Sequence, residues 1–172
     1  IISMGFNAKM YANNDFNVKK SVKPQRLKVG DTIGLISPCS PIPESRYAKA
    51  IANIEAMGFK VKVGKNILNR NGYLAGTDEQ RLEDIHCMFE DSEVNGIWCM
   101  RGGYGATRIL DKINYHLIKD NPKVFIGYSD ITALLQAFHI KTGLICFHGP
   151  VANSEFTPYT LEHVKNILMN PT

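Results

Sequence analysis

The sequence is organised by short apolar runs that alternate with stretches of helical periodicity. Runs of a few residues, bounded by glycine, proline or polar residues, are typical of strands covered on both faces of a sheet. Between them, apolar residues recur at spacings of three and four, as they do on one face of a helix. The expected strands are residues 32–36, 59–63, 96–100, 124–127 and 144–147.

Turn and cap residues support the helical segments. Thr77 and Gln80 have the spacing of a capping box, and Gly58 and Gly143 stand where helices commonly end. The run 59–63 alternates apolar and polar residues, which indicates an edge strand. The expected helices are residues 44–57, 77–90, 106–112, 114–119, 131–142 and 160–169. The alternation predicts an α/β fold, a mostly parallel sheet flanked by helices in a layered sandwich of the flavodoxin or Rossmann type.

Every unusual loop of the sequence follows one of the predicted strands. In an open parallel sheet, ligands bind beyond the carboxyl ends of the strands, so these loops are expected to share one rim. Four such loops on one rim predict a functional site there. They are Ser37-Pro38-Cys39-Ser40-Pro41, Arg101-Gly102-Gly103-Tyr104-Gly105, Gly127-Tyr128-Ser129-Asp130 and His148-Gly149-Pro150.

The basic charge of the chain is concentrated near its start. The net charge is +4, and residues 1–28 carry six basic side chains and one acidic side chain, which gives +5 and leaves about −1 elsewhere. Nucleic-acid binding needs basic and aromatic side chains together on a folded face, so we expect no nucleic-acid partner. A length of 172 residues suits one domain or slightly more. We expect residues 1–26 to form a loosely ordered leader, native or tag-derived, and a folded domain from residue 27.

The cysteines indicate neither a metal site nor a disulfide framework. Cys39, Cys87, Cys99 and Cys146 include no Cys-x-x-Cys pair, and the histidines have no ligand-like spacing. Cys99 and Cys146 fall in predicted buried strands, where a free cysteine acts as a small hydrophobe. We therefore expect a reducing, cytoplasmic setting. No apolar run reaches the roughly 18 residues of a membrane span, so we expect no membrane partner.

Ser129 admits two interpretations from its position between a predicted strand and a predicted helix. Serine and aspartate are both favoured at helix N-caps, so Ser129 and Asp130 fit a purely structural cap. The alternative is a nucleophile presented on a sharp turn, with amide donors nearby for an oxyanion. The Gly-x-Ser-x-Gly pattern of hydrolases is only half met, because Ile131 stands at the second glycine position.

The glycines of the 101–105 loop are equally open to a structural and a functional interpretation. They either only make the turn, or let backbone N–H groups approach a ligand, as an oxyanion hole or a phosphate cradle does. A phosphate or dinucleotide site is disfavoured, because the chain lacks Gly-x-Gly-x-x-Gly after the first strand and lacks a Gly-Lys-Ser/Thr motif. We therefore expect no cofactor. Arg101 either binds a substrate carboxylate or is a solvated charge, and His148 lies at a strand end on the same rim.

Taken together and in order, these motifs resemble the LD-carboxypeptidase family of serine peptidases. That family includes muropeptide LD-carboxypeptidases and hydrolases of the microcin C immunity type. The resemblance spans roughly residues 27–155. The matching segments are 27–31 with 36–38, 72–77 with Arg81-Leu82, Met100 to Gly105, Gly127 to Thr132, and His148-Gly149-Pro150.

The resemblance implies an N-terminal α/β domain, with Ser129 as the nucleophile. It implies an oxyanion hole built from backbone amides, which map to Gly102, Gly103 and Asp130. We predict that four further residues of these motifs contact substrate. They are Arg101, Tyr104, His148 and Ser37.

The resemblance also implies the reaction, which is cleavage of the amide between an L- and a D-amino acid in a peptidoglycan tetrapeptide. D-alanine is released in cytosolic cell-wall recycling, and the enzyme is expected to be a homodimer. The family's catalytic Glu and His belong to a second domain, so residues 27–172 are expected to be the N-terminal domain of a longer protein and inert alone. The alternatives are hydrolysis of aminoacyl-nucleotide amides, and a non-catalytic module that binds a nucleotide or another ligand.

Overall fold

The computed structural model describes residues 20–170 and contains a five-stranded parallel sheet in the order β2-β1-β3-β4-β5. The predicted α/β fold is confirmed, and β2 is the edge strand that its alternating sequence indicates. The strands are β1 (Thr32–Ile36), β2 (Lys60–Val63), β3 (Val94–Cys99), β4 (Val124–Gly127) and β5 (Phe147–His148).

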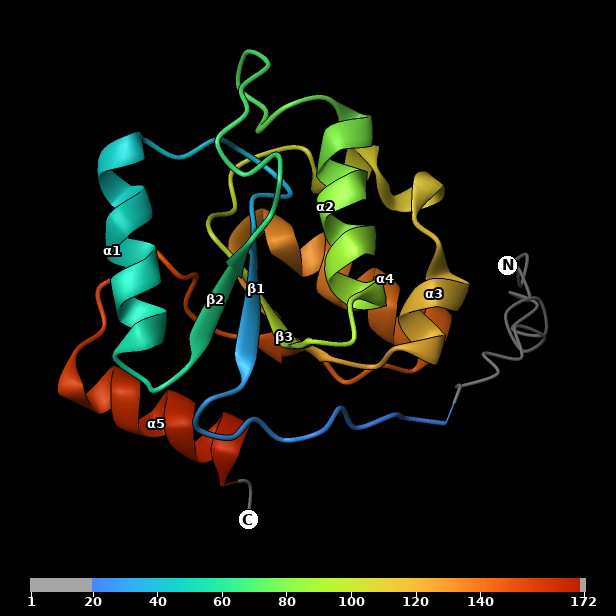
Figure 1. Cartoon of the computed structure of the whole chain (residues 1–172). Coiled ribbons are helices and arrows are strands. Elements are labelled where there is room, and N and C mark those ends of the chain that lie inside the picture. Colours follow the sequence, from blue (N-terminus) through green and yellow to red (C-terminus); the bar gives the residue numbers. More distant parts are fainter. Residues whose placement is uncertain (1–19, 171–172) are drawn as a thin grey trace, which may run out of the picture.

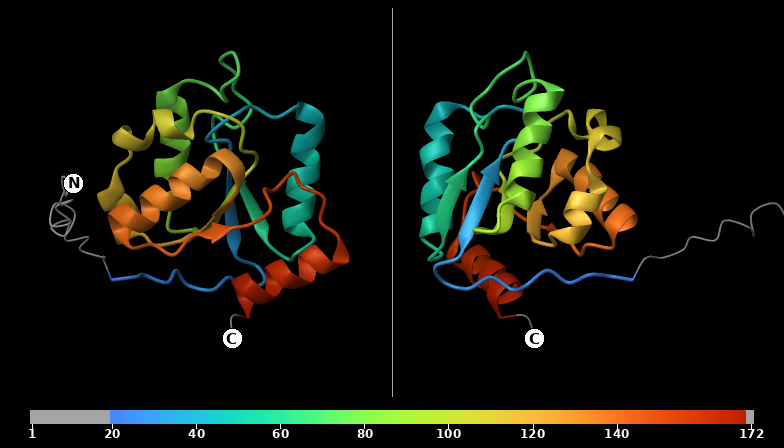
Figure 2. Two further views of the ribbon diagram at one scale, coloured as in Figure 1. Left: turned by 180° about the vertical axis from the view of Figure 1, so that it is seen from behind. Right: turned by 45° about the vertical axis from the view of Figure 1, so that its right-hand side comes forward.

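Helices cover both faces of the sheet, as Figures 1 and 2 show. One face packs against α1 and α5, and the other packs against α2, α3 and α4. The carboxyl ends of the strands lie together at the top of Figure 1, and α5 lies near the opposite end. The helices are α1 (Glu44–Glu55), α2 (Asp78–Glu90), α3 (Tyr115–Asp120), α4 (Thr132–Thr142) and α5 (Pro158–Met169).

The apolar runs form strands with two buried faces because successive side chains point to opposite sides of the sheet. Leu35 enters the core beneath α1 and α5, whereas Ile36 enters the core beneath α2 and α4. In β3, Trp98 likewise enters the core beneath α1 and α5, and Cys99 enters the core beneath α2 and α4. A strand that is apolar at consecutive positions therefore suits only a central place in the sheet.

Most predicted helix ends are confirmed by their local geometry. The Thr77 hydroxyl accepts from the Gln80 amide at 3.3 Å, while the Gln80 side chain accepts from the Thr77 amide at 2.9 Å. Gly58 and Gly143 follow their helices with φ of +91° and +85°, the left-handed conformation that favours glycine. The predicted helix 131–142 begins one residue later, after a 3-10 turn over Ser129–Ile131.

Two predicted elements are wrong in detail. Residues 106–112 form two 3-10 turns, Ala106–Arg108 and Leu110–Lys112, instead of an α-helix. A segment this short satisfies its amides by bonds to the third preceding carbonyl, as Arg108 does to Gly105. The strand predicted at 144–147 pairs with β4 only through Phe147 and His148.

The last strand is short because the residues before it pair elsewhere. The Val22 amide donates to the Gly143 carbonyl, and the Ile145 amide donates to the Val22 carbonyl, each at 2.9 Å. Leu144 thereby forms a bridge to Val22 instead of extending β5. Cys146, predicted in a buried strand, lies ahead of β5 and is only half-buried.

The predicted leader lies largely outside the described residues, which begin at residue 20. Residues 20–26 contain the bridge at Val22, and the Leu27 amide donates to the Leu168 carbonyl of α5 at 2.9 Å. The domain boundary at residue 27 stays a prediction. Within residues 20–170, every helix is too short or too polar to cross a membrane.

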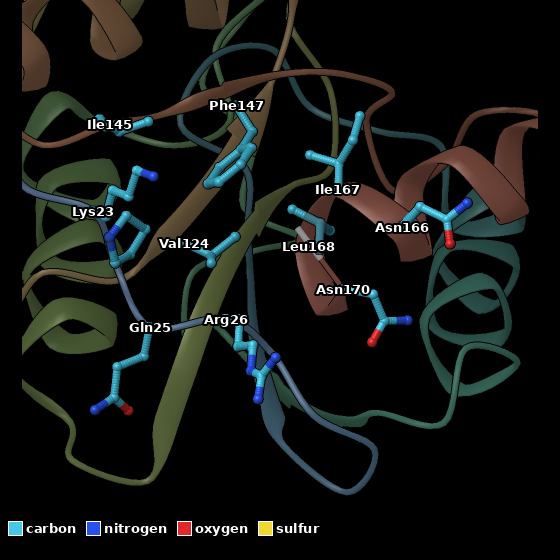
Figure 3. Close-up of a pocket in the computed structure, with 11 residues that line it drawn as sticks. Lys23, Gln25, Arg26, Val124, Ile145, Phe147, Asn166, Ile167, Leu168 and Asn170 are labelled. Carbon is cyan, nitrogen blue, oxygen red and sulfur yellow. The ribbon is translucent and has the colours of Figure 1, made fainter. Parts of the chain in front are cut away.

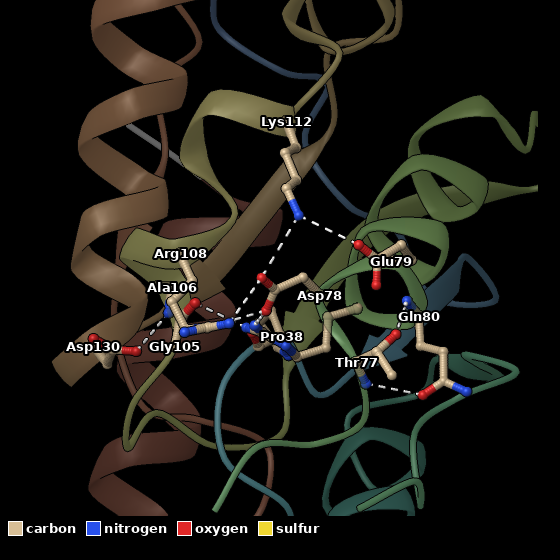
Figure 4. A network of polar contacts seen from close by, with 11 residues as sticks. Pro38, Thr77, Asp78, Glu79, Gln80, Gly105, Ala106, Arg108, Lys112 and Asp130 are labelled. Carbon is tan, nitrogen blue, oxygen red and sulfur yellow. Dashed lines mark hydrogen bonds and ion pairs between the residues drawn. The ribbon is translucent and has the colours of Figure 1, made fainter. Parts of the chain in front are cut away.

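A buried arginine connects two loops of the rim to the start of α2. Arg81 is 1% exposed, and its Nη1 donates to the carbonyls of Pro38 at 2.6 Å and Gly105 at 2.8 Å. Its Nη2 donates to Asp78, which also accepts from Arg108 at 3.1 and 3.2 Å (Figure 4). The loops after β1 and β3 are therefore fixed by one guanidinium whose charge Asp78 balances.

We expect Asp78→Asn to lower the free energy of unfolding of the chain by about 2 kcal/mol, because Arg81 would keep a buried charge without its anion. Urea unfolding followed by circular dichroism measures this change. The matched control is Glu79→Gln, which removes an exposed carboxylate that pairs with Lys112 at 3.3 Å and should change stability little.

The loss of stability in Asp78→Asn should also depend on pH. Hydrogen bonds from Arg108 and then from Arg81, opposed by partial burial, hold the pKa of Asp78 below its usual range. A lowered pKa gives stability that is present above the unfolded pKa of about 4 and is lost as pH falls through the folded pKa. The difference between wild type and Asp78→Asn should therefore narrow below about pH 4. Equal losses for both variants at neutral pH would contradict this role of Asp78.

Candidate active site

Ser129 stands on a strained turn between β4 and α4. It is exposed, and its φ of +64° is the only positive φ of a non-glycine residue among residues 20–170. Such a conformation costs roughly 1–3 kcal/mol and is found mostly where the surrounding structure and function require it. The turn is tight, because a Cβ at Gly127 would lie 2.5 Å from the Ile131 side chain.

The interpretation of Ser129 as a helix cap is wrong. The residue that caps α4 is Ile131, and neither α4 nor the 3-10 turn before it has a side-chain cap hydrogen bond. The Ser129 side chain is therefore not used to begin the helix. Its exposure on the rim leaves the hydroxyl accessible to a ligand.

The glycine loop after β3 lies directly against this turn. A Cβ at Gly102 would lie 2.9 Å from the Ser129 Cβ and 3.2 Å from the Asp130 amide nitrogen. Real Cβ atoms do not approach this closely, so only glycine allows this contact without a shift of the backbone. Gly103 has a φ of +105°, so the loop needs glycine for its conformation as well. The backbone of the loop and the serine turn are thereby brought together.

Ser40 holds the glycine loop from the other side, although no sequence motif singled it out as a site residue. The Ser40 amide donates to the Gly102 carbonyl, and the Ser40 hydroxyl accepts from the Tyr104 amide, both at 3.1 Å. The carbonyl of Gly102 and the N–H of Gly103 belong to one trans peptide plane and point in opposite directions. Because the carbonyl faces Ser40, the Gly103 N–H points away from Ser40.

Asp130 joins the serine turn to the end of the glycine loop. Its Oδ2 accepts from the Ala106 amide at 2.9 Å. Cys39 lies close to this carboxylate, and burial, followed by the negative charge of Asp130, raises the pKa of the Cys39 thiol far above its usual range. Cys39 is therefore a thiol at neutral pH and not a competing nucleophile, since the thiolate is the reactive form.

The four predicted substrate residues differ in their exposure and in their contacts. Arg101 and Tyr104 are exposed on either side of the glycine pair, and the Arg101 Nη1 donates to the Pro41 carbonyl at 3.1 Å. His148 is exposed, and its ring lies edge-on to the Tyr128 ring, with centroids 6.3 Å apart. Ser37 is 4% exposed, and its hydroxyl has no hydrogen-bond partner within the described residues.

Two hydrogen bonds, one to β3 and one to β4, fix the loop that carries His148. The Gly149 amide donates to the Gly127 carbonyl at 3.1 Å, and the Trp98 indole donates to the Pro150 carbonyl at 2.7 Å. The His148 ring therefore lies against Tyr128, the residue that directly precedes Ser129 in the serine turn. No hydrogen bond within residues 20–170 links Ser129 to a histidine or a carboxylate.

The hollows of the surface differ in chemistry. One of about 440 Å³ adjoins the glycine loop and contains Arg70, Tyr73, Arg101 and Tyr104. Another, of about 710 Å³, lies at the amino ends of β4 and β5, next to Val124 and α5 (Figure 3). Its lining holds no serine, cysteine, histidine or acid, so it offers no catalytic group of these kinds.

In residues 20–170, no three His, Cys, Asp or Glu side chains are grouped to hold a metal ion.

Comparison with known proteins identifies the family of the chain. Residues 33–149 match the family model described as the LD-carboxypeptidase N-terminal domain. A probable murein peptide carboxypeptidase of Bacillus subtilis is 47% identical over 133 residues, which are 77% of this chain and 42% of that protein. The murein tetrapeptide carboxypeptidase of Pseudomonas aeruginosa is 40% identical over 121 residues, 70% of this chain and 39% of that protein.

A solved structure is similar at the level of the whole fold. The microcin C7 self-immunity protein MccF, also a curated relative from Escherichia coli, has been solved in complex with aspartyl sulfamoyl adenosine. That structure is 31% identical with a TM-score of 0.83, over 88% of this chain and 48% of that one. The matched residues thus cover less than half of each of these proteins. The family match and these identities show that the chain belongs to the LD-carboxypeptidase family, whose N-terminal domain it contains.

Proposed function

We propose that this chain is the nucleophile-bearing domain of a serine carboxypeptidase of the LD type. The reaction is hydrolysis of the amide between an L- and a D-amino acid in a peptidoglycan tetrapeptide, with release of D-alanine in cell-wall recycling. The observation that carries the proposal is the contact of Gly102 with the strained, exposed Ser129, where a Cβ would lie only 2.9 Å from the serine Cβ.

The proposed chemistry follows from this contact. The Ser129 Oγ attacks the carbonyl carbon of the scissile amide, and its proton passes to a general base. The carbonyl oxygen becomes an oxyanion, which the amides of Gly102, Gly103 and Asp130 stabilise. The positive end of α4 favours the same charge. The C–N bond then breaks, the amine of D-alanine leaves with a proton, and water hydrolyses the ester on Ser129.

The base and the acid that orients it are proposed to come from outside this chain. The family resemblance assigns these roles to a His and a Glu of a second domain, and the chain spans 42% of its Bacillus subtilis relative. His148 belongs to a different motif and is proposed to contact substrate. Arg101 and Tyr104, which are also exposed, are proposed to contact substrate with it, whereas Ser37 is 4% exposed and is left out of this proposal.

A second candidate is hydrolysis of an aminoacyl-nucleotide amide. The likeness to MccF, solved with aspartyl sulfamoyl adenosine, favours it, with a TM-score of 0.83. The nucleophile and the oxyanion donors would be the same, so the two candidates differ in the groups that flank the scissile bond. A non-catalytic module that binds a nucleotide or another ligand is a third candidate, and it predicts that Ser129 resists a reactive phosphonate.

We further propose a cytoplasmic, homodimeric enzyme. The four cysteines are free in the structure, which suits a reducing compartment. The dimer rests on the family resemblance. Light scattering on the full-length protein determines the number of subunits.

Ser129→Ala in the full-length protein should lower kcat for a tetrapeptide ending in D-alanine by at least about 10⁴-fold, because the acyl-enzyme can no longer form. Release of D-alanine is measured, with an aminoacyl sulfamoyl adenosine assayed in parallel. The matched control is Ser45→Ala, an exposed serine of α1 that should keep full activity. Turnover of only the nucleotide substrate would favour the second candidate, and activity that survives Ser129→Ala would refute both hydrolases.

The 172-residue chain alone should release no measurable D-alanine, because the proposed base is absent from it. Mass spectrometry of the products over hours provides the measurement. Release that disappears in Ser129→Ala of the same chain would show that a base lies within it, contrary to the proposal.

Ser40→Ala in the full-length protein should lower kcat roughly 10- to 100-fold and leave KM within about twofold. The variant keeps the backbone bond from Ser40 to Gly102 but removes the hydroxyl that accepts from the Tyr104 amide, so the adjacent Gly103 amide is expected to shift. The oxyanion forms only in the transition state, so this shift affects kcat and not ground-state binding. Steady-state kinetics and the rate of phosphonate labelling at Ser129 are the measurements. A lower melting temperature with unchanged kcat would show that Ser40 only supports the fold.

A further inference from the structure

The hollow beside the glycine loop combines residues from three separate loops. It has a volume of about 440 Å³, and Ser40, Arg101 and Tyr104 are among its lining residues. Arg70 and Tyr73 come from the loop between β2 and α2, which the sequence did not connect with the site. Because Arg101 and Tyr104 are the chain neighbours of the glycine pair, the hollow adjoins the glycine loop that carries the proposed oxyanion donors.

The two arginines bring positive charge to the hollow without any balancing acid. Neither Arg70 nor Arg101 forms an ion pair within the described residues, and no acidic residue lines the hollow. Each guanidinium instead donates to one backbone carbonyl, that of Gly72 at 3.2 Å or that of Pro41 at 3.1 Å. These bonds orient the side chains and leave their charge and most of their N–H donors unused.

The aromatic walls add a rigid surface for the rest of a ligand. The rings of Tyr73 and Tyr104 meet edge to face, with centroids 6.4 Å apart and planes at 88°. The two residues are 63% and 71% exposed, which is unusual for residues that contribute so much apolar area. Tyrosine offers such contact area with little loss of side-chain entropy.

A second hollow near Ser129 is less suited to an anion. It contains Arg46, Lys49, Tyr128 and Glu155, and it has a volume of about 380 Å³. The Lys49 ammonium pairs with the Glu155 carboxylate at 3.0 Å, so part of its positive charge is already balanced. Arg46 is therefore the alternative anion-binding arginine that a test of the first hollow has to exclude.

We propose that the hollow formed by Arg70, Arg101, Tyr73 and Tyr104 binds a carboxylate on a residue next to the scissile amide. The inference rests on the proposed function and extends it, because it assigns specificity for charge to a defined pair of arginines. A guanidinium binds a carboxylate through two parallel N–H donors, and two guanidiniums in one hollow strengthen that preference. A nucleotide phosphate is the competing anion, and the test separates the two.

The test uses the full-length protein and three tetrapeptides. One has all carboxylates free, one is amidated at the terminal D-alanine, and one is amidated at a side-chain carboxyl of the third residue. For the wild-type enzyme, kcat/KM should be about tenfold or more higher for the peptide with free carboxylates than for one of the two amidated peptides. Arg101→Gln and the double variant with Arg70→Gln should lose that preference, because KM rises for the free peptide and not for that amide.

The controls are Arg46→Gln, which removes the rival charge, and Arg26→Gln, an exposed arginine beside the distant hollow at the amino ends of the strands. Both should keep the preference. The proposal is overturned if wild type cleaves all three peptides equally, if the double variant keeps the preference, or if Arg46→Gln abolishes it. It is also overturned if the arginine substitutions relieve inhibition by adenosine monophosphate but leave peptide kinetics unchanged.

A binding measurement separates this proposal from the proposed function. Calorimetry on the Ser129→Ala protein should give at least about tenfold weaker binding of the free tetrapeptide when Arg70 and Arg101 are both glutamine. Weaker binding without turnover of any peptide by wild type would refute the peptidase and keep the carboxylate site. Equal binding by the two proteins would refute the carboxylate site, whatever the turnover.

Discussion

The close contact between Gly102 and Ser129 is the constraint on which the whole rim depends. The backbone of one loop lies against the serine turn of another, where a Cβ would lie 2.9 Å from the Ser129 Cβ. The contact puts main-chain amides beside a hydroxyl without any side chain between them. In this turn Ser129 holds a φ of +64°, at a cost of roughly 1–3 kcal/mol that the surrounding packing must offset.

Three buried or half-buried side chains maintain this contact, and each joins loops from different strands. Arg81 holds the loops after β1 and β3, and Asp130 ties the serine turn to Ala106. Ser40 fixes the glycine loop through its amide, which donates to the Gly102 carbonyl, and its hydroxyl, which accepts from the Tyr104 amide. The rim is therefore a set of cross-linked loops, so the geometry of the proposed oxyanion hole is set before any substrate binds.

Local patterns predicted most of the fold because their causes are local. The capping box at Thr77 and the glycine at Gly143 work within one helix, so they can be recognised from spacing alone. The errors lie where distant residues compete for the same backbone. Leu144 looks like part of a strand, but the amide and carbonyl of Val22 bind its neighbours, and only Phe147 and His148 remain to pair with β4.

The sequence by itself determined the order of elements and the parallel sheet, because these follow from periodicity. It left a structural and a functional role open for Ser129 and for the glycine loop, and the resemblance of the ordered motifs to a family favoured the functional role. Only the tertiary structure decided that Ser129 caps no helix, that Ser40 grips the glycine loop, and that Arg70 and Arg101 share one hollow. Those relations join residues 30 to more than 60 positions apart. Their physical basis is the packing of separate loops at one end of a sheet, which no local pattern records.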